Sequence, residues 1–262
     1  MLAVCIGFTA GALSGLLGIG GGVVVVPALV YLVHLNQRQA HGTSLFAIFC
    51  TAVAGAWYYS LHSKVDWAIA LEMAFGGVLG AVLGAKLCAI CSNQRLRQIF
   101  GVFLILVGLR MLTDWAFNGN SLEARHQILF ANSFSDGLLI ALLGVLTGVL
   151  SGLLGIGGGV IMIPALVFLV GLSQKVAQGI SLAVIVPVSI SGSAIHWAHG
   201  NVRFKVGAWV AIGGLLGSLA GAKMALGAEE VTLRALFGLV MLSFGAGMLK
   251  PRPAQKECAQ GD

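Results

Sequence analysis

The nine residues Ser14-Gly-Leu-Leu-Gly-Ile-Gly-Gly-Gly22 occur a second time, unchanged, as Ser151-Gly-Leu-Leu-Gly-Ile-Gly-Gly-Gly159. Around them, 18 of 23 positions are identical between residues 11–33 and residues 148–170. The same offset of 137 positions aligns Gly42-Thr-Ser-Leu45 with Gly179-Ile-Ser-Leu182 without a gap. The chain is therefore predicted to be a duplication. Its parts are a first repeat (1–125), a linker (126–136), a second repeat (137–250) and a C-terminal tail (251–262).

The composition excludes a soluble domain. Hydrophobic residues make up 58% of the 262 residues and charged residues only 9%, whereas soluble domains carry about 25% charged residues. The charge-free stretches Met1–Gln37 and Gly137–Gln174 are each long enough to cross the ~30 Å apolar layer of a bilayer. With the shorter apolar runs that follow each, the sequence predicts an all-α polytopic membrane protein with about eight membrane segments, four in each repeat.

The charges and motifs give no indication of nucleic-acid binding, of a cofactor or of an enzyme. The net charge of +6 comes from cations that stand singly between apolar runs, which is typical of loop charges that orient a membrane protein. Cys88 and Cys91 have the spacing of zinc ligands, but no second pair completes a metal site. Nucleotide-binding and nucleophile–base motifs are absent from the sequence, so we expect an ion gradient to supply any energy for transport.

The glycine-rich stretch of each repeat lies in the middle of a segment that is too long for one straight crossing. As an unbroken helix, residues 2–33 would span ~48 Å, against an apolar core of ~30 Å. Adjacent glycines cost roughly 1 kcal/mol each inside a helix, and a proline, Pro27 or Pro164, follows each run. Segments one and five are therefore predicted to break into half-helices or to fold back within the membrane.

Paired breaks of this kind are the best sequence indication of a transport site. Unwound backbone is tolerated at membrane depth only where protein buries it or a water-filled cavity receives it, and the free N–H groups at a helix N-terminus attract anions. Close helix packing explains Gly11, Gly15 and Gly18 equally well, but it does not explain three adjacent glycines before a proline. The candidate substrate-binding residues are Gly18, Gly20, Gly21, Gly22 and Pro27, with Gly155, Gly157, Gly158, Gly159 and Pro164.

This paired motif, followed in each repeat by Gly-x-Ser-Leu, resembles the TauE/SafE sulfite exporter family, also called the toluene-sulfonate uptake permeases, over essentially the whole chain. The resemblance implies a multi-pass carrier in the bacterial inner membrane that exports sulfite, an organosulfonate or a related sulfur-containing anion by alternating access. Coupling to protons and assembly as a homodimer are compatible with the resemblance, which does not decide either of them. An anion-selective channel and a carrier of a non-sulfur organic anion are the alternatives.

The resemblance also adds three hydroxyl residues, Thr43, Ser44 and Ser181, to the candidate substrate ligands. Ile180 stands where the first repeat has Thr43, so the two half-sites cannot be equivalent donors. The alternative is that these hydroxyls bond carbonyl groups of their own helices.

Two charges inside the predicted membrane segments, Glu72 and Arg110, have no counterpart in the second repeat. An unpaired charge at membrane depth is costly, so we expect the two side chains to form an ion pair. The alternatives are that each reaches the headgroups separately, or that Glu72 carries a coupling proton.

The orientation of the halves follows from the distribution of Lys and Arg. If segments one and five each cross the membrane once, the halves are parallel and the cations divide eight to seven between the two sides. If these segments turn back within the membrane, the halves are inverted and the cations divide nine to six. The positive-inside rule then predicts that the loop at Arg38 and both termini are cytoplasmic, with the loop at Lys175 outside.

Overall fold

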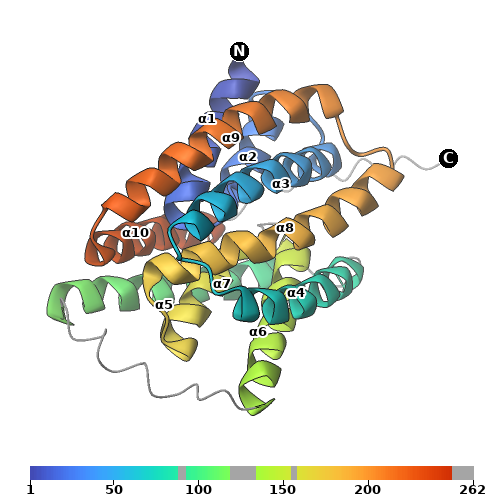
Figure 1. The fold of residues 1–262 in the computed structure, drawn as a ribbon. Helices are drawn as coiled ribbons and strands as arrows, with labels where there is room; N and C mark the ends of the chain where they lie inside the picture. Colours follow the sequence, from blue (N-terminus) through green and yellow to red (C-terminus); the bar gives the residue numbers. More distant parts are fainter. Residues whose placement is uncertain (88–92, 119–133, 155–157, 250–262) are drawn as a thin grey trace.

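The computed structural model describes residues 1–87, 93–118, 134–154 and 158–249, and every regular element within these ranges is a helix (Figure 1). The elements are α1 (Leu2–Leu17), α2 (Gly22–Tyr31), α3 (Gln37–Leu61), α4 (Trp67–Leu87), α5 (Asn93–Asn118), α6 (Phe134–Leu154), α7 (Gly159–Ala165) with a following π-helical turn (Leu166–Val170), α8 (Gln174–Ala198), α9 (Phe204–Gly227) and α10 (Glu230–Leu249). The predicted all-α class is therefore confirmed. The C-terminal tail lies outside the described residues.

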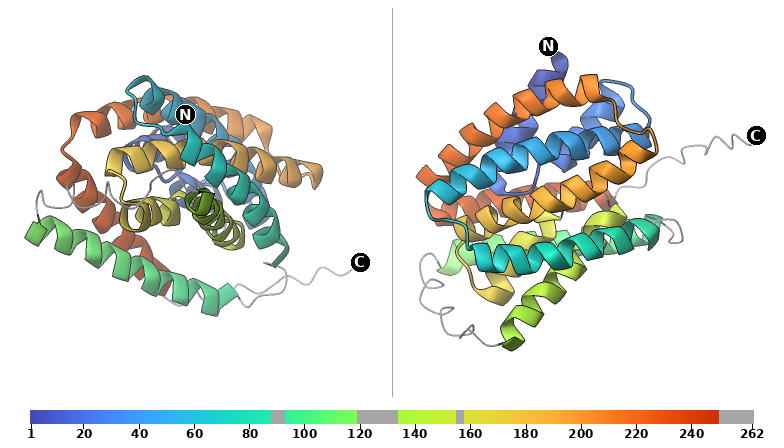
Figure 2. Two further views of the ribbon diagram at one scale, coloured as in Figure 1. Left: turned by 60° about the horizontal axis from the view of Figure 1, so that its bottom comes forward. Right: turned by 45° about the vertical axis from the view of Figure 1, so that its right-hand side comes forward.

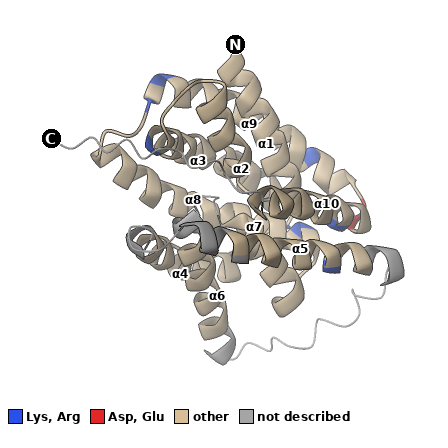
Figure 3. Cartoon of the chain, turned by 180° about the vertical axis from the view of Figure 1, so that it is seen from behind, with Lys and Arg blue, Asp and Glu red and all other residues tan. Residues whose placement is uncertain are grey.

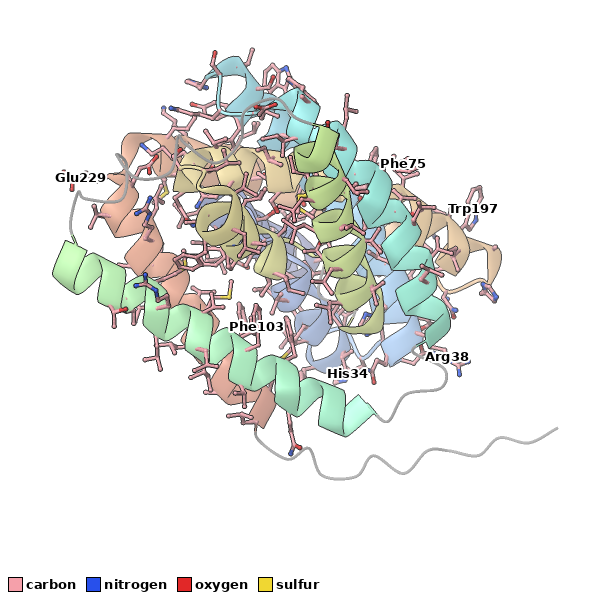
Figure 4. The ribbon with its side chains drawn as sticks, turned by 90° about the horizontal axis from the view of Figure 1, so that it is seen from below. His34, Arg38, Phe75, Phe103, Trp197 and Glu229 are labelled. Carbon is pink, nitrogen blue, oxygen red and sulfur yellow. The ribbon has the colours of Figure 1, made fainter. Side chains whose placement is uncertain are left out.

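The described helices agree with a polytopic membrane protein. Five of them are long and apolar enough to cross a bilayer, namely α3, residues Trp67–Gly84 of α4, α8, α9 and α10, and further shorter apolar helices accompany them. Large apolar side chains are exposed on the outside: Phe75 is 69% and Trp197 65% accessible, and both are seen at the edge of the molecule in Figure 4. Apolar surface on this scale is what a helix bundle presents to lipid.

Side chains cap the starts of α3 and α8. The Asn36 side chain accepts a hydrogen bond from the backbone N–H of Gln39 (2.8 Å) at the start of α3. At the matching repeat position, Ser173 accepts one from Val176 at the start of α8 (3.4 Å). Both caps satisfy a backbone donor that the first helical turn leaves free.

Small residues bring helix pairs into backbone contact. α1 runs along α9 and α6 runs along α4 (Figure 1). A Cβ at Gly7, Gly11 or Gly15 of α1 would overlap the backbone of α9, so these positions require glycine for close packing. The packing explanation therefore holds for Gly11 and Gly15.

Most of the long helices pack mainly with helices of the other repeat. α9, from the second repeat, packs against α1 and α3, whereas α4, from the first repeat, packs against α6 and α8. α3 and α8 pack together between these groups, and α5 pairs with α10 (Figure 2). The packing of α9 on α1 and α3 thus corresponds, at the 137-residue offset, to the packing of α4 on α6 and α8.

α3 and α8 run in opposite directions. Near the start of α3, Thr43 contacts Arg203 in the loop that follows α8. Near the start of α8, a Cβ at Gly179 would overlap the carbonyl group of Lys64, just after α3 ends. The loops before α3 and before α8 therefore lie at opposite ends of the bundle, which is the relation that inverted halves require.

Charge differs between these two ends. The starts of α3 and α9 carry cations, seen in blue in Figure 3, and Figure 4 places His34 and Arg38 away from Glu229. The cations at this end include Arg38, Arg203 and Lys205, whereas the other end carries both Lys64, Lys175 and Lys223 and the acidic residues Asp66, Glu229 and Glu230. That the Arg38 end is the cytoplasmic one stays a prediction.

Candidate functional site

The first glycine run breaks the helix, as predicted. α1 ends at Leu17 and α2 begins at Gly22. Between them, Gly18, Gly20 and Gly21 have φ angles of +72°, +78° and +71°, a left-handed conformation that costs roughly 1–2 kcal/mol for any residue with a Cβ. Residues 18–22 are all buried. The break is therefore an unwound stretch of backbone inside the protein.

The second run also separates two helices. α6 ends at Leu154 and α7 begins at Gly159, with Gly158 at a φ of +57°. Gly158 and Gly159 are buried. Gly155 and Gly157, two of the candidate ligands, lie outside the described residues.

The two breaks meet in the middle of the molecule. A Cβ at Gly159 would lie 2.6 Å from the carbonyl oxygen of Gly18 and 2.9 Å from the Cα of Ile19. Such distances leave room for a hydrogen atom only, so the backbone of the first break packs directly on the first residue of α7. Ser181 of α8 stabilises this contact, because its hydroxyl donates a hydrogen bond to the same Gly18 oxygen (2.9 Å).

The first break also contains a row of backbone donors with no acceptor. Among the described residues, nothing accepts a hydrogen bond from the N–H groups of Ile19, Gly20, Gly21, Gly22 or Val23. More than 90% of buried N–H groups in proteins are paired, so a buried run of this length is unusual. Successive N–H groups at positive φ form an anion-binding concavity, and the N-terminus of α2 adds its partial positive charge. The chemistry of this backbone suits an oxyanion.

Three buried polar residues also have side-chain atoms that lack partners, two of them (Ser14 and Gln178) in contact with the break. The hydroxyl of Ser14, both amide atoms of Gln174 and the amide nitrogen of Gln178 are unpaired among the described residues, and all three residues are fully buried. The sequence analysis did not single out Gln174 and Gln178. Their spacing of four, followed by Ser181, places three polar side chains on one face of an apolar helix, and this signal was available in the sequence.

Tyr59 connects Gln178 to the end of α1. Its hydroxyl oxygen lies 3.0 Å from the carbonyl oxygen of Gly15 and 3.0 Å from the side-chain oxygen of Gln178. Tyr59 is itself fully buried. The sequence analysis did not predict a role for this residue either.

The three predicted hydroxyl ligands have different partners. Thr43 accepts a hydrogen bond from the backbone N–H of Arg203 (3.0 Å). Ser44 donates to the carbonyl of His41, one turn earlier in its own helix (2.9 Å). Only Ser181, of these three, reaches a glycine break. Their role as substrate ligands stays a prediction.

The two prolines differ in burial. Pro27 is exposed within α2, whereas Pro164 is buried within α7, directly before the π-helical turn. A proline cannot donate the backbone hydrogen bond that a regular helix needs at this point. Their role at the substrate site stays a prediction.

Glu72 and Arg110 belong to different packing pairs. Glu72 is exposed on α4, with a carboxylate oxygen 3.3 Å from where a Cβ would stand at Gly137 of α6. The guanidinium carbon of Arg110 lies 5.9 Å from the ring centre of Phe168. The ion pair between Glu72 and Arg110 therefore stays a prediction.

Interrupted helices that meet inside an apolar bundle are characteristic of membrane transporters, and known proteins place the chain in this class. A family model described as Sulfite exporter TauE/SafE matches residues 138–260. A probable membrane transporter protein of Xylella fastidiosa (strain Temecula1) is 31% identical, over 87% of each chain. The probable membrane transporter protein YunE of Bacillus subtilis is 29% identical, over 95% of this chain and 97% of its own.

The chain belongs to the TauE/SafE sulfite exporter family. Its similarity extends to an archaeon: a probable membrane transporter protein of Methanocaldococcus jannaschii is 28% identical over 77% of this chain and 73% of its own. These relatives are named as transporters and not as enzymes. No solved structure matches the chain.

Proposed function

We propose that the protein is a secondary transporter of a small anion, namely sulfite, an organosulfonate or a related sulfur-containing anion, which it exports across the bacterial inner membrane by alternating access. The observation that carries this proposal is the row of N–H groups from Ile19 to Val23, buried as far as Gly22, which finds no acceptor among the described residues.

Backbone donors suit an oxyanion for two reasons. An oxyanion has several acceptor oxygens in a small volume, so it can satisfy several adjacent N–H groups at once. Backbone N–H groups also carry no ionisable proton, so they bind an anion without fixing a full countercharge in the membrane. A weakly held anion can leave again, as transport requires.

The contact between the breaks supports alternating access. The backbone at Gly18 and Ile19 packs on Gly159, so a shift of one break relative to the other changes the surroundings of the anion. Rocking of one bundle against another around a central site is the usual mechanism of transporters built from repeats. The proposed substrate ligands are the glycines of both breaks with Pro27, Thr43, Ser44, Pro164 and Ser181.

Protons are the proposed coupling ions, with Glu72 as the candidate carrier and Arg110 as its candidate partner. A homodimer remains compatible with this proposal. The alternative functions are an anion-selective channel, which would use the same breaks without a conformational cycle, and a carrier of a non-sulfur organic anion.

Flux into proteoliposomes tests the function. We expect labelled sulfite to enter liposomes that contain the purified protein, with a rate that saturates with concentration and responds to a pH gradient. Organosulfonates and carboxylates added as competitors would rank the substrates. Flux that rises linearly with concentration and ignores the gradient would indicate a channel, and no anion flux at all would refute the proposal.

A further inference from the structure

One face of α8 lies along the first glycine break. Gln178 contacts Gly18, since a Cβ there would stand 2.8 Å from the Cα of Gln178. One turn later, Ser181 donates to the carbonyl of Gly18, and another turn on, Ile185 would meet a Cβ at Gly20 at 3.0 Å. The side chains at positions 178, 181 and 185 therefore follow the unwound backbone from Gly18 to Gly20.

Gln178 differs from the other residues on this face because only one of its two polar side-chain atoms has a hydrogen-bond partner among the described residues. The residue is fully buried, and its side-chain oxygen lies 3.0 Å from the Tyr59 hydroxyl, but its amide nitrogen has no acceptor among the described residues. A buried donor without a partner costs stability. The buried amide NH2 of Gln178 and the unpaired backbone N–H groups of the first break are all donors. Together they indicate a ligand that accepts hydrogen bonds from both.

Tyr59 determines which end of the amide faces the break. Its hydroxyl carries one hydrogen, so it donates either to Gly15 or to the Gln178 oxygen, both 3.0 Å away. When it donates to Gln178, the amide oxygen is held toward Tyr59 and the NH2 group is directed away from it. Tyr59 is thus able to orient Gln178 as a donor.

We propose that the side-chain amide of Gln178 is a substrate ligand that donates a hydrogen bond to an oxygen of the anion at the first break, and that Tyr59 is the residue that positions it. This inference rests on the proposed function and narrows its substrate class. Donors fixed in different directions, the amide among them, match the separate oxygens of an oxyanion better than a single spherical halide ion, so we expect the site to favour oxyanions over halide ions. Sites built to hydrogen-bond a substrate discriminate strongly against analogues that lack the bonding group.

The second break lacks this pair. At the 137-residue offset, His41 stands in the place of Gln178 and His196 in the place of Tyr59. His196 is next to the start of α3, since a Cβ at Gly42 would lie 2.9 Å from the Cβ of His196. The amide ligand therefore belongs to the first break alone.

The test compares four variants in proteoliposomes with labelled sulfite. Gln178→Met keeps the shape and removes the donor, Gln178→Glu replaces the donor by a carboxylate, and Tyr59→Phe removes the orienting hydroxyl. Gln37→Met is the matched control, because Gln37 is exposed at the start of α3. KM and kcat for sulfite are measured for each, together with inhibition by chloride.

We expect KM to rise about tenfold or more in both Gln178 variants and less in Tyr59→Phe, with kcat changed little and the Gln37→Met control unchanged. Chloride should inhibit Gln178→Met more strongly, relative to sulfite, than it inhibits the wild type. Thermal unfolding of each purified variant, with and without sulfite, compares sulfite binding among the variants without a transport assay. The same measurement shows whether each variant is folded.

Two results overturn the inference in different ways. If the wild type transports sulfite and Gln178→Met has the same KM and chloride sensitivity, Gln178 is not a ligand and the proposed function stands. If neither sulfite nor any other oxyanion moves through the wild type or stabilises it, the proposed function fails and the inference fails with it.

Discussion

The two glycine breaks have the same nine-residue sequence but different surroundings. The first is followed by the ten-residue helix α2, in which Pro27 is exposed; the second is followed by the seven-residue α7 and a π-helical turn, and Pro164 is buried. Ser181 reaches across to the first break, whereas its counterpart Ser44 bonds its own helix. The motif therefore separates two helices in each repeat, and the neighbouring helices determine the contacts that each break makes.

The largest effect is expected from filling the breaks themselves. Gly21→Leu and Gly158→Leu should reduce sulfite flux to background while membrane insertion is retained. Both positions have positive φ, and a Cβ at Gly21 would lie 3.0 Å from the carbonyl oxygen of Ala10. Flux at equal expression is the measurement.

Gly200→Leu is the control for backbone strain, because Gly200 also has a positive φ (+68°) but no atom within 4 Å of its Cβ position. If this variant lost transport as fully as Gly21→Leu, strain alone would explain both. Wild-type flux in either break variant would show that the glycine at that position has no role in transport.

The serine pair provides the next comparison. Ser181→Ala should lower the free energy of unfolding by about 1–2 kcal/mol, because the buried carbonyl of Gly18 loses its side-chain donor. Ser44→Ala should change it by less than about 0.5 kcal/mol, since that hydroxyl bonds only a carbonyl of its own helix. Chemical unfolding in detergent measures both, and equal effects would mean that the two positions are equivalent after all.

A smaller effect on stability is expected from the two charges that only the first repeat carries. If Glu72 and Arg110 form an ion pair, a double-mutant cycle with Glu72→Gln and Arg110→Gln should give a coupling free energy of about 1 kcal/mol. Additive effects would exclude the pair. A Glu72→Gln variant that unfolds like the wild type but no longer responds to a pH gradient would identify Glu72 as the proton carrier.

The smallest difference is expected between the prolines. Pro164→Ala should lower sulfite flux a few-fold, because an N–H at this buried position can draw the following π-helical turn into a regular helix. Pro27→Ala should lower flux less, by about twofold, since Pro27 is exposed and α2 is regular around it. Sulfite flux is measured for both variants in matched proteoliposomes. A larger loss of flux in Pro27→Ala than in Pro164→Ala would show that Pro27 is the more important of the two prolines.

Those features of the fold that depend on local chemistry could be predicted from the sequence. Composition alone indicated an all-helical membrane protein, and the first break lies where three adjacent glycines and a proline make a continuous helix costly. The paired motif correctly indicated the family. These predictions succeeded because each depends on residues that are close together in the chain.

The remaining features depend on contacts between distant residues. Ser44 and Ser181 stand in the same motif, and no local signal distinguishes the one that bonds its own helix from the one that contacts Gly18. Gln178 was missed although its spacing from Gln174 and Ser181 is visible in the sequence, because polar residues near a helix start are usually solvated. Its contact with Tyr59 joins residues 119 positions apart. The packing of α4 with the second repeat and α9 with the first had no signature either, because glycines line several helices.

The pairing of α1 with α9 also has a consequence in time. A Cβ at Gly7 of α1 would overlap the carbonyl of Val210 in α9, so the glycine face of α1 has no permanent neighbour until roughly 200 further residues have been made. At ~5–20 residues per second, the ribosome needs ~10–40 s for them. Throughout that interval the face must be covered by lipid, by a temporary helix partner or by the insertion machinery. A nascent chain stopped before α9 should therefore leave α1 open to crosslinking, and release of the stalled chain should close it.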